Sequence, residues 1–383
     1  TLRTPLLGFT TWNAFGSEVS QKDILRTADY LVESGLAECG YAYVNLDSGW
    51  QSVYGGPFDA IQPNAKFPDM KAMYDHLHGL GLKGGIYSTP MLQAWGCPKE
   101  FKSIPGCTRG EADDRFAPNM TGIGKDRCER NNVRQWAAWG VDYLKYDWDP
   151  TDPVNADLMK RELLACPRQI DFCVTVRANP LYARYWTRNC CSFRDNGDTR
   201  DEWGSVMARF GTLAAWEKIV CPGHFYDLDM LALGSTVWNN GKTRFNGNEE
   251  QAAFTLHAFV PSPIQLSCRL WELTPREVNL VANDEILAIN QDVLCDFPRL
   301  VREEKGAGRN FRVYRRELAG ERAALAVFNL GDAVLTESFP LGARFRVRDA
   351  WTKTDLGVRE AVDLKVLPHA AAVFVLASVP PDK

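Results

Sequence analysis

Acidic side chains recur where apolar runs of the sequence end. The segment Y-L-K-Y-D-W-D, residues 143–149, finishes an apolar strand with Asp147 and Asp149, and aromatic rings stand on either side of the first acid. Similar endings occur in N-L-D-S-G-W (45–50), F-R-D-N-G-D (193–198) and Y-D-L-D (226–229). One aspartate after a strand is commonly a helix cap, but four such endings beside aromatic rings fit capping alone poorly. We expect these residues to share one site.

The residue types at these ends indicate glycoside cleavage. The ends of the first six expected strands carry no histidine and no serine in a nucleophile elbow, so acyl transfer is poorly supported. Paired carboxylates can divide the work of glycoside cleavage, one acting at the anomeric carbon and the other protonating the leaving oxygen. A metal-dependent hydrolase or isomerase would need His or clustered acidic ligands. With five His and no C-x-x-C pair, we expect no metal site and no cofactor.

Regular alternation of short strands and helices must position these residues. Apolar or β-branched runs predict eight strands, at 6–12, 43–50, 83–89, 141–148, 171–178, 190–198, 224–230 and 263–268. Helical periodicity follows each of them, at 21–34, 69–80, 131–139, 155–164, 181–188, 205–218, 249–259 and 274–290. This order predicts a (β/α)8 barrel, whose strands present their carboxyl ends to one pocket. An open doubly wound sheet is the alternative, but no glycine-rich phosphate loop follows the first strand.

Two further regions stand out from this alternation. Residues 91–130 form a long Cys-, Gly- and Pro-containing insertion after the third strand, and such loops at the carboxyl face of a barrel usually shape a site. After Asp292 the sequence changes to short alternating runs such as A-A-L-A-V-F-N-L, without helical signals. We therefore expect a catalytic barrel over residues 1–293 and a small antiparallel β-sandwich domain over residues 294–383.

Composition narrows the choice of partner and compartment. The net charge of −4 and the lack of a membrane-length apolar run give no reason to expect nucleic acid or a membrane as partner. Eleven cysteines and the sequon Asn119-Met120-Thr121 favour an oxidising compartment: secreted, periplasmic or lysosome-like. Cys97, Cys107 and Cys128 lie in the insertion, where a disulfide-stapled loop is expected. The sequence does not indicate whether the protein is a monomer or an oligomer.

Seven motifs, in order along nearly the whole chain, resemble those of glycoside hydrolase family 27, the α-galactosidase and α-N-acetylgalactosaminidase family. The quoted stretches are T-P-L-L-G-F-T-T-W-N-A-F-G, Y-V-N-L-D-S-G-W, Y-L-K-Y-D, F-R-D-N-G-D, D-L-D-M-L-A-L-G and I-L-A-I-N-Q-D, together with the P-L-Y after the fifth strand. The resemblance implies a retaining mechanism with Asp147 as nucleophile and Asp198 as general acid/base. Their carboxyl groups should then lie roughly 5–5.5 Å apart.

The resemblance also implies how the sugar is held. Trp12 is expected to stack on the ring, Asp47 to accept bonds from hydroxyls, and Lys145 and Arg194 to donate to the sugar near the two acids. The remaining residues expected to bind substrate are Ser48, Tyr87, Arg177 and Tyr182. Asp227 and Asp229 are expected to support the site from behind.

The chain departs from the family pattern at its specificity positions. Ser48 stands where galactose-specific members usually carry a second acid, and Arg177-Ala178 precedes N-P-L-Y where a Glu or Ser is usual. Ala178 leaves room for a substituent, while Arg177 either meets an anionic substrate or pairs with Asp195. The family's disulfide between the first loop and the second strand would need Cys at Ser17 and Gly49, and both are absent.

The leading interpretation is an exo-acting retaining glycosidase that hydrolyses terminal α-galactoside-like residues of an oligosaccharide or polysaccharide. Other substrates within the family stay open: α-N-acetylgalactosaminide, β-L-arabinopyranoside, isomaltose-type dextran and a substituted galactan unit. A non-catalytic sugar-binding protein is the rival from another class, but it would be expected to have lost one of the two acids. Both Asp147 and Asp198 are present.

Overall fold

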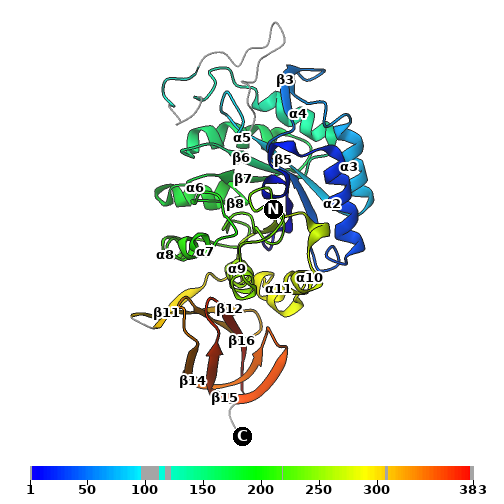
Figure 1. Ribbon diagram of the computed structural model, residues 1–383. Coiled ribbons are helices and arrows are strands. Elements are labelled where there is room, and N and C mark those ends of the chain that lie inside the picture. The colour runs from blue at the N-terminus through cyan, green and yellow to red at the C-terminus, as the bar shows by residue number, and fades with distance from the viewer. Residues whose placement is uncertain (1, 96–111, 117–121, 218, 307–308, 380–383) are drawn as a thin grey trace.

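The structure, a computed structural model, describes residues 2–95, 112–116, 122–217, 219–306 and 309–379. A barrel forms one end of the molecule and an antiparallel sheet domain the other, with helices α9, α10 and α11 at the junction (Figure 1). The expected β/α alternation is therefore confirmed.

Eight parallel strands make the barrel sheet, in the order β10-β1-β2-β5-β6-β7-β8-β9. The sheet closes because Leu231, just beyond β9, bridges Leu266 of β10 in parallel, and its N–H donates to the carbonyl of Gln265 at 2.8 Å. Several strands stop earlier than expected, since the loops that follow them bend into the site. The strands are β1 (Leu7–Thr10), β2 (Tyr43–Leu46), β5 (Lys83–Ser88), β6 (Tyr143–Asp147), β7 (Asp171–Thr175), β8 (Ser192–Phe193), β9 (Phe225–Tyr226) and β10 (Ile264–Leu266).

A helical layer covers the barrel, and side-chain caps explain where many of its helices begin. Asp152 accepts bonds from Val154 and Asn155 at the start of α5, and Thr274 accepts one from Glu277 at the start of α10. The principal helices are α2 (Gln21–Glu33), α3 (Met70–Gly79), α4 (Glu129–Trp139), α5 (Pro153–Ala165), α6 (Ala183–Asn189), α7 (Trp203–Phe210), α8 (Leu213–Trp216), α9 (Gly247–Phe259), α10 (Pro275–Val281) and α11 (Asp284–Asn290). Short helical turns are α1 (Trp12–Phe15), η1 (Gly16–Glu18), η2 (Pro180–Tyr182) and η3 (Leu270–Glu272).

Two helices expected to be continuous are interrupted. The segment 274–290 divides into α10 and α11 because Asn283 caps a new helix, its side chain accepting from Glu285 and Ile286. The segment 205–218 divides at Gly211 and Thr212 into α7 and α8. A hairpin that the periodicity did not predict, β3 (Gln51–Gly55) with β4 (Ala60–Pro63), lies between β2 and α3.

The insertion expected at 91–130 leaves the barrel between β5 and α4. Its two described arms meet in antiparallel bridges between Met91 and Ile123 and between Ala112 and Gly124. Cys97, Cys107 and the sequon at Asn119 lie outside the described residues. Eight cysteines elsewhere are free thiols: Cys39, Cys166, Cys173, Cys190, Cys191, Cys221, Cys268 and Cys295.

The C-terminal sheet is antiparallel, as expected, and both faces of its inner strand β13 are covered. Its strands are β11 (Arg299–Gly306), β12 (Arg309–Leu318), β13 (Arg322–Asn329), β14 (Leu335–Asp349), β15 (Thr354–Val366) and β16 (Ala371–Ser378), in the order β11-β12-β13-β16-β14-β15. Along β13, Ala324, Ala326 and Phe328 join the barrel core. Their neighbours Ala323, Leu325 and Val327 join a core within the domain.

The barrel and the C-terminal domain are tied by polar contacts as well as by this shared core. Gln251 of α9 exchanges two hydrogen bonds with the main chain of Ala371, and buried Arg316 donates to the carbonyl of Phe259 at 2.9 Å. The expected boundary at 293/294 falls between the end of α11 at Asn290 and the start of β11 at Arg299. Among the described helices, none combines the length and apolar character that a membrane span requires.

Candidate active site

A cavity of about 190 Å³ opens at the carboxyl ends of the barrel strands. Seven of the ten residues predicted for the site line it, including both predicted catalytic acids. The full lining is Trp12, Asp47, Trp95, Lys145, Asp147, Asp149, Val176, Arg177, Arg194, Gly197 and Asp198. The strand topology thus brings together side chains that lie as far apart in the sequence as Trp12 and Asp198.

Strand β6 delivers the central pair of charges. Successive strand residues point to opposite faces, so Lys145 and Asp147 both face the cavity, while Tyr146 and Trp148 face the helical layer. The Tyr146 hydroxyl donates to Glu129 of α4 at 3.2 Å, and Nε1 of Trp148 donates to Asp152 at 2.9 Å. The two rings therefore buttress the strand from behind. Although Tyr146 and Trp148 flank Asp147 in the sequence, neither ring lines the cavity.

Lys145 and Asp47 form a buried ion pair across the cavity floor. Nζ of Lys145 donates to Oδ2 of Asp47 at 2.7 Å, and Asp47 is 3% exposed. Oδ1 of Asp47 accepts from its neighbour Ser48 N–H at 2.8 Å, which fixes the carboxylate further. Burial alone would lower the pKa of Lys145, but the carboxylates of Asp47 and Asp147 outweigh it and raise that pKa above its usual value. Lys145 therefore stays protonated beside Asp147.

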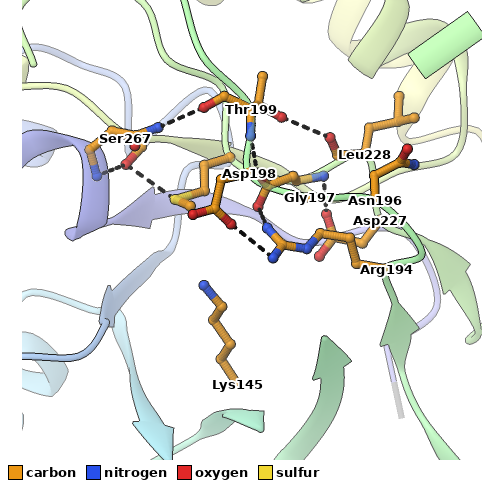
Figure 2. Close-up of polar contacts among 12 residues, drawn as sticks. Lys145, Arg194, Asn196, Gly197, Asp198, Thr199, Asp227, Leu228 and Ser267 are labelled. Carbon is orange, nitrogen blue, oxygen red and sulfur yellow. Dashed lines mark hydrogen bonds and ion pairs between the residues drawn. The ribbon is translucent and has the colours of Figure 1, made fainter. Parts of the chain in front are cut away.

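Arg194 at the end of β8 anchors the second acid. Its Nη2 donates to Oδ1 of Asp198 at 3.0 Å, and its Nη1 contacts Oδ1 of Asp229. Asp229 also accepts from the N–H of Thr199, the residue after Asp198, at 2.6 Å. Figure 2 shows the Asp198 carboxylate turned towards the Arg194 guanidinium, with the Lys145 ammonium directed at the same space. Asp229 does not line the cavity but holds the arginine and the acid's own segment, as expected of a supporting residue.

The two acids differ in their surroundings. Burial raises the pKa of Asp147 to about 7; Lys145 and Arg194 oppose this rise, and Asp198 and Asp47 add to it. Oδ1 of Asp147 has no hydrogen-bond partner in the described chain. The side chain of Asp198, in contrast, is 40% exposed at the cavity mouth. One carboxylate is thus enclosed, with its burial only partly offset by Lys145 and Arg194, and the other is open to solvent.

Arg177 occupies the wall beside Asp147 in an unexpected arrangement. Its φ of 59° lies in the left-handed region, and its Nη1 pairs with Oδ2 of Asp149 at 3.0 Å. The alternative that Arg177 pairs with Asp195 is wrong, because Trp216 and Tyr226 donate to the Asp195 carboxylate at 2.6 Å each. Ala178 was expected to leave room for a substituent, but it is fully buried and absent from the cavity lining.

Three predicted residues do not line the cavity. Ser48 is buried and donates to the carbonyl of Trp95 at 2.5 Å, so its hydroxyl is already engaged. Tyr87 is buried behind the wall; burial, followed by the charges of Asp147 and Asp47, raises the pKa of its hydroxyl. Tyr182 is 46% exposed on η2, with its ring edge-on to Trp186 at 6.3 Å. None of the three is therefore among the residues that line the cavity.

Four lining residues were missed: Trp95, Asp149, Val176 and Gly197. Asp149 lies two residues beyond the end of β6 at Asp147, so strand periodicity does not fix its side, and its place in the acidic strand end Y-D-W-D was the only signal for it. Trp95 had no such signal, since it belongs to the insertion, where no periodicity fixes direction. Within the described chain, no group of three or more His, Cys, Asp or Glu side chains is arranged to hold a metal ion.

The first loop and the second strand end touch at the positions where the family places a disulfide. Gly49 has φ of +115°, and a Cβ added there would lie 2.9 Å from Cα of Ser17. The backbone approach therefore requires glycine, and the contact is made without sulfur.

Comparisons with known proteins agree with this architecture. The family model described as Alpha galactosidase A matches residues 4–109 and 124–292, and the Alpha galactosidase C-terminal beta sandwich domain matches residues 308–376. An α-galactosidase from Oryza sativa subsp. japonica is 29% identical over 391 residues, covering 98% of this chain and 85% of the relative. One from Coffea arabica is 29% identical over 387 residues, covering 97% and 93%.

Solved structures share the fold over the same length. A β-L-arabinopyranosidase of glycoside hydrolase family 27 from Geobacillus stearothermophilus, in complex with arabinose, has a TM-score of 0.85 at 24% identity and covers 98% of both chains. The α-galactosidase I from Mortierella vinacea has a TM-score of 0.83 at 24% identity, covering 98% of this chain and 97% of its own. The family models account for most of the barrel and most of the C-terminal sheet. The chain belongs to glycoside hydrolase family 27, the α-galactosidase family.

Proposed function

We propose that the protein is an exo-acting retaining glycosidase that removes terminal α-galactoside-like residues by double displacement. The observation that carries this proposal is that Asp147 and Asp198 line one small cavity in contrasting environments. Two carboxylates with different surroundings at one site are what a nucleophile and an acid/base require.

In the first step, ionised Asp147 attacks the anomeric carbon and the bond to the leaving oxygen breaks. Asp198 donates a proton to that oxygen, so the departing group leaves neutral. Enclosure of Asp147 and its free Oδ1 support the role of nucleophile, because a weakly solvated carboxylate with an unused oxygen is ready to form a bond. Exposure of Asp198 at the mouth suits an acid that meets first the leaving group and then water.

In the second step, Asp198 removes a proton from water, which attacks the glycosyl–enzyme ester and releases the sugar with its original anomeric configuration. Lys145 favours the ionised form of Asp147, and Arg194 keeps the Asp198 carboxylate in one orientation. Trp12 offers a ring face to the sugar, and Asp47 with Lys145 offers an acceptor and a donor to its hydroxyls. The reaction needs no cofactor.

Charge balance favours a neutral sugar over an anionic one. Four carboxylates and three cations line the cavity, and each cation already contacts a carboxylate. An anionic substituent near Arg177 would also face Asp149 and Asp147, so repulsion would offset much of the attraction. We therefore consider a substituted, anionic galactan unit a less favoured substrate than a neutral α-galactoside. The α-N-acetylgalactosaminide, β-L-arabinopyranoside and isomaltose-type substrates remain as alternatives with the same mechanism.

Hydrolysis of a panel of nitrophenyl glycosides tests the substrate, and NMR of the first-formed anomer tests the stereochemistry. We expect α-galactoside cleavage with release of the α-anomer. Activity confined to β-D-glucosides or β-D-galactosides would overturn the assignment. The Asp147→Asn variant should lose turnover and keep sugar binding; wild-type rates in this variant would remove Asp147 from the mechanism.

A further inference from the structure

We infer that Trp238 and Arg200 form a second subsite, which binds the sugar unit of the leaving group next to the cavity for the cleaved sugar. This inference rests on the proposed function, because it takes Asp198 as the acid that protonates the leaving oxygen. The ligand class is a neutral sugar linked to the terminal residue of an oligosaccharide.

Trp238 is an exposed aromatic ring at the edge of the cavity. Trp238 is 41% exposed. Its ring centroid lies 6.4 Å from that of Trp12, which lines the cavity. The two rings are inclined at 54°, so they present faces in different directions. Trp12 can therefore contact the terminal sugar while Trp238 contacts the next one. Amphipathic indole rings suit the apolar faces of sugars.

The indole is held in one orientation although it is exposed. Nε1 of Trp238 donates to Oδ1 of Asn13 at 2.9 Å, and the Trp238 N–H donates to Oγ1 of Thr236 at 3.2 Å. A platform fixed before the ligand arrives costs less conformational entropy on binding.

The same contacts place Trp238 on the leaving-group side. Nδ2 of Asn13 donates to the carbonyl of Thr199 at 3.4 Å, and Thr199 directly follows Asp198. The general acid must lie beside the oxygen that departs. A ring tied through Asn13 to the segment that carries the acid is therefore positioned to meet the departing sugar.

Arg200 adds hydrogen-bond donors to this platform. Arg200 lies two residues after Asp198 in the sequence. Its guanidinium carbon is 4.7 Å from the Trp238 ring centroid. Within the described chain, Arg200 makes no ion pair with a carboxylate, so its N–H groups are available to sugar hydroxyls. A purely structural stack is the alternative reading. Arg26 of α2 makes one on Trp271 at 3.8 Å and serves as a matched control.

The test compares a substrate that has a leaving sugar with one that has none. In α-galactosyl fluoride the leaving group is fluoride, which is too small to reach Trp238; in raffinose it is sucrose. For Trp238→Ala we expect kcat/KM for raffinose to fall about tenfold, and kcat/KM for α-galactosyl fluoride to stay within about twofold of wild type. Trp238→Tyr should recover most of the raffinose activity because it keeps an aromatic face. Arg200→Ala should show a smaller loss on raffinose alone.

Three outcomes separate the possibilities. If Trp238→Ala loses activity equally on both substrates, or loses none on raffinose, the subsite is wrong while the proposed function stands. If Arg26→Ala reproduces the effect of Arg200→Ala, the role of Arg200 is structural and its place in the subsite is wrong. If wild-type protein hydrolyses neither substrate, the proposed function fails, and this inference fails with it.

Discussion

Nη2 of Arg194 lies 3.0 Å from Oδ1 of Asp198. The arginine is 3% exposed, and its other terminal nitrogen contacts buried Asp229. The solvent-exposed end of this arrangement is Asp198, whose side chain is 40% exposed. The acid at the cavity mouth is thus oriented by a charge that is itself fixed from below.

Replacing Asp229 should therefore weaken both folding and the site. In Asp229→Asn, Arg194 loses its buried partner, and breaking such a pair from one side typically costs about 3–5 kcal/mol. Urea unfolding at pH 7 measures the change. Asp157→Asn removes an exposed carboxylate 3.7 Å from Arg161 and should change stability by less than about 0.5 kcal/mol. Equal effects of the two substitutions would contradict the anchoring role of Asp229.

The pH dependence of kcat/KM should report Asp147. The nucleophile must be ionised, and burial raises its pKa to about 7, so activity should fall as pH drops below that value. Lys145 lowers the pKa of Asp147, so Lys145→Met should move this acid limb to higher pH. Lys83→Met, at the exposed start of β5, is the control and should leave the limb in place. A limb that does not move in Lys145→Met would exclude Asp147 as the titrating group.

Neutralising the nucleophile should stabilise the protein at high pH. The ordinary carboxyl pKa of 3.8 applies to Asp147 in the unfolded chain, and the pKa is about 7 in the folded protein. Between these values the folded state holds a proton that the unfolded state has lost, so this group's contribution to stability decreases as pH rises, and it stays low above 7. The Asp147→Asn variant avoids this loss, which amounts to at most roughly 4 kcal/mol.

Thermal unfolding of both proteins at pH 4 and pH 8 checks this. The melting temperature of Asp147→Asn should exceed that of wild type clearly at pH 8 and little at pH 4. The same difference at both pH values would mean that the gain does not come from removing a buried charge.

The pair of Arg177 and Asp149 should matter for binding and not for folding. The Arg177 side chain is 63% exposed, and ion pairs at such sites contribute less than about 1 kcal/mol. For Arg177→Ala we expect an unfolding free energy within that range of wild type, and a KM for a neutral α-galactoside raised roughly five- to tenfold. Steady-state kinetics with an α-galactoside and an α-galacturonide give the comparison. Wild-type preference for the galacturonide would show that Arg177 binds an anion.

The sequence predicted the barrel because strand and helix periods repeat through it, and it predicted the acids because they stand at strand ends. Both signals depend on local pattern, which β6 illustrates: Lys145 and Asp147 lie on one face of the strand and both line the cavity. The sequence did not predict the orientation of side chains whose position depends on loops. Ser48 turns to the carbonyl of Trp95, a partner contributed by the insertion, and Tyr182 follows the bend at Arg177 onto the surface.

The assignment of aromatic residues shows the same limit. Tyr146 and Trp148 flank Asp147 in the sequence but point to the helical layer, because neighbours in a strand face opposite sides. Trp238 lies 225 positions from Asn13, yet it is the ring that Asn13 orients. Contacts of this range come from closure of the barrel and have no counterpart in local periodicity.

The approach of Gly49 to Ser17 has a practical consequence. Because these two segments meet through backbone contacts and not through a disulfide, a reducing agent has no bond between Ser17 and Gly49 to reduce. The contact between Ser17 and Gly49 should persist in dithiothreitol, so the purified enzyme can be kept under reducing conditions without weakening it.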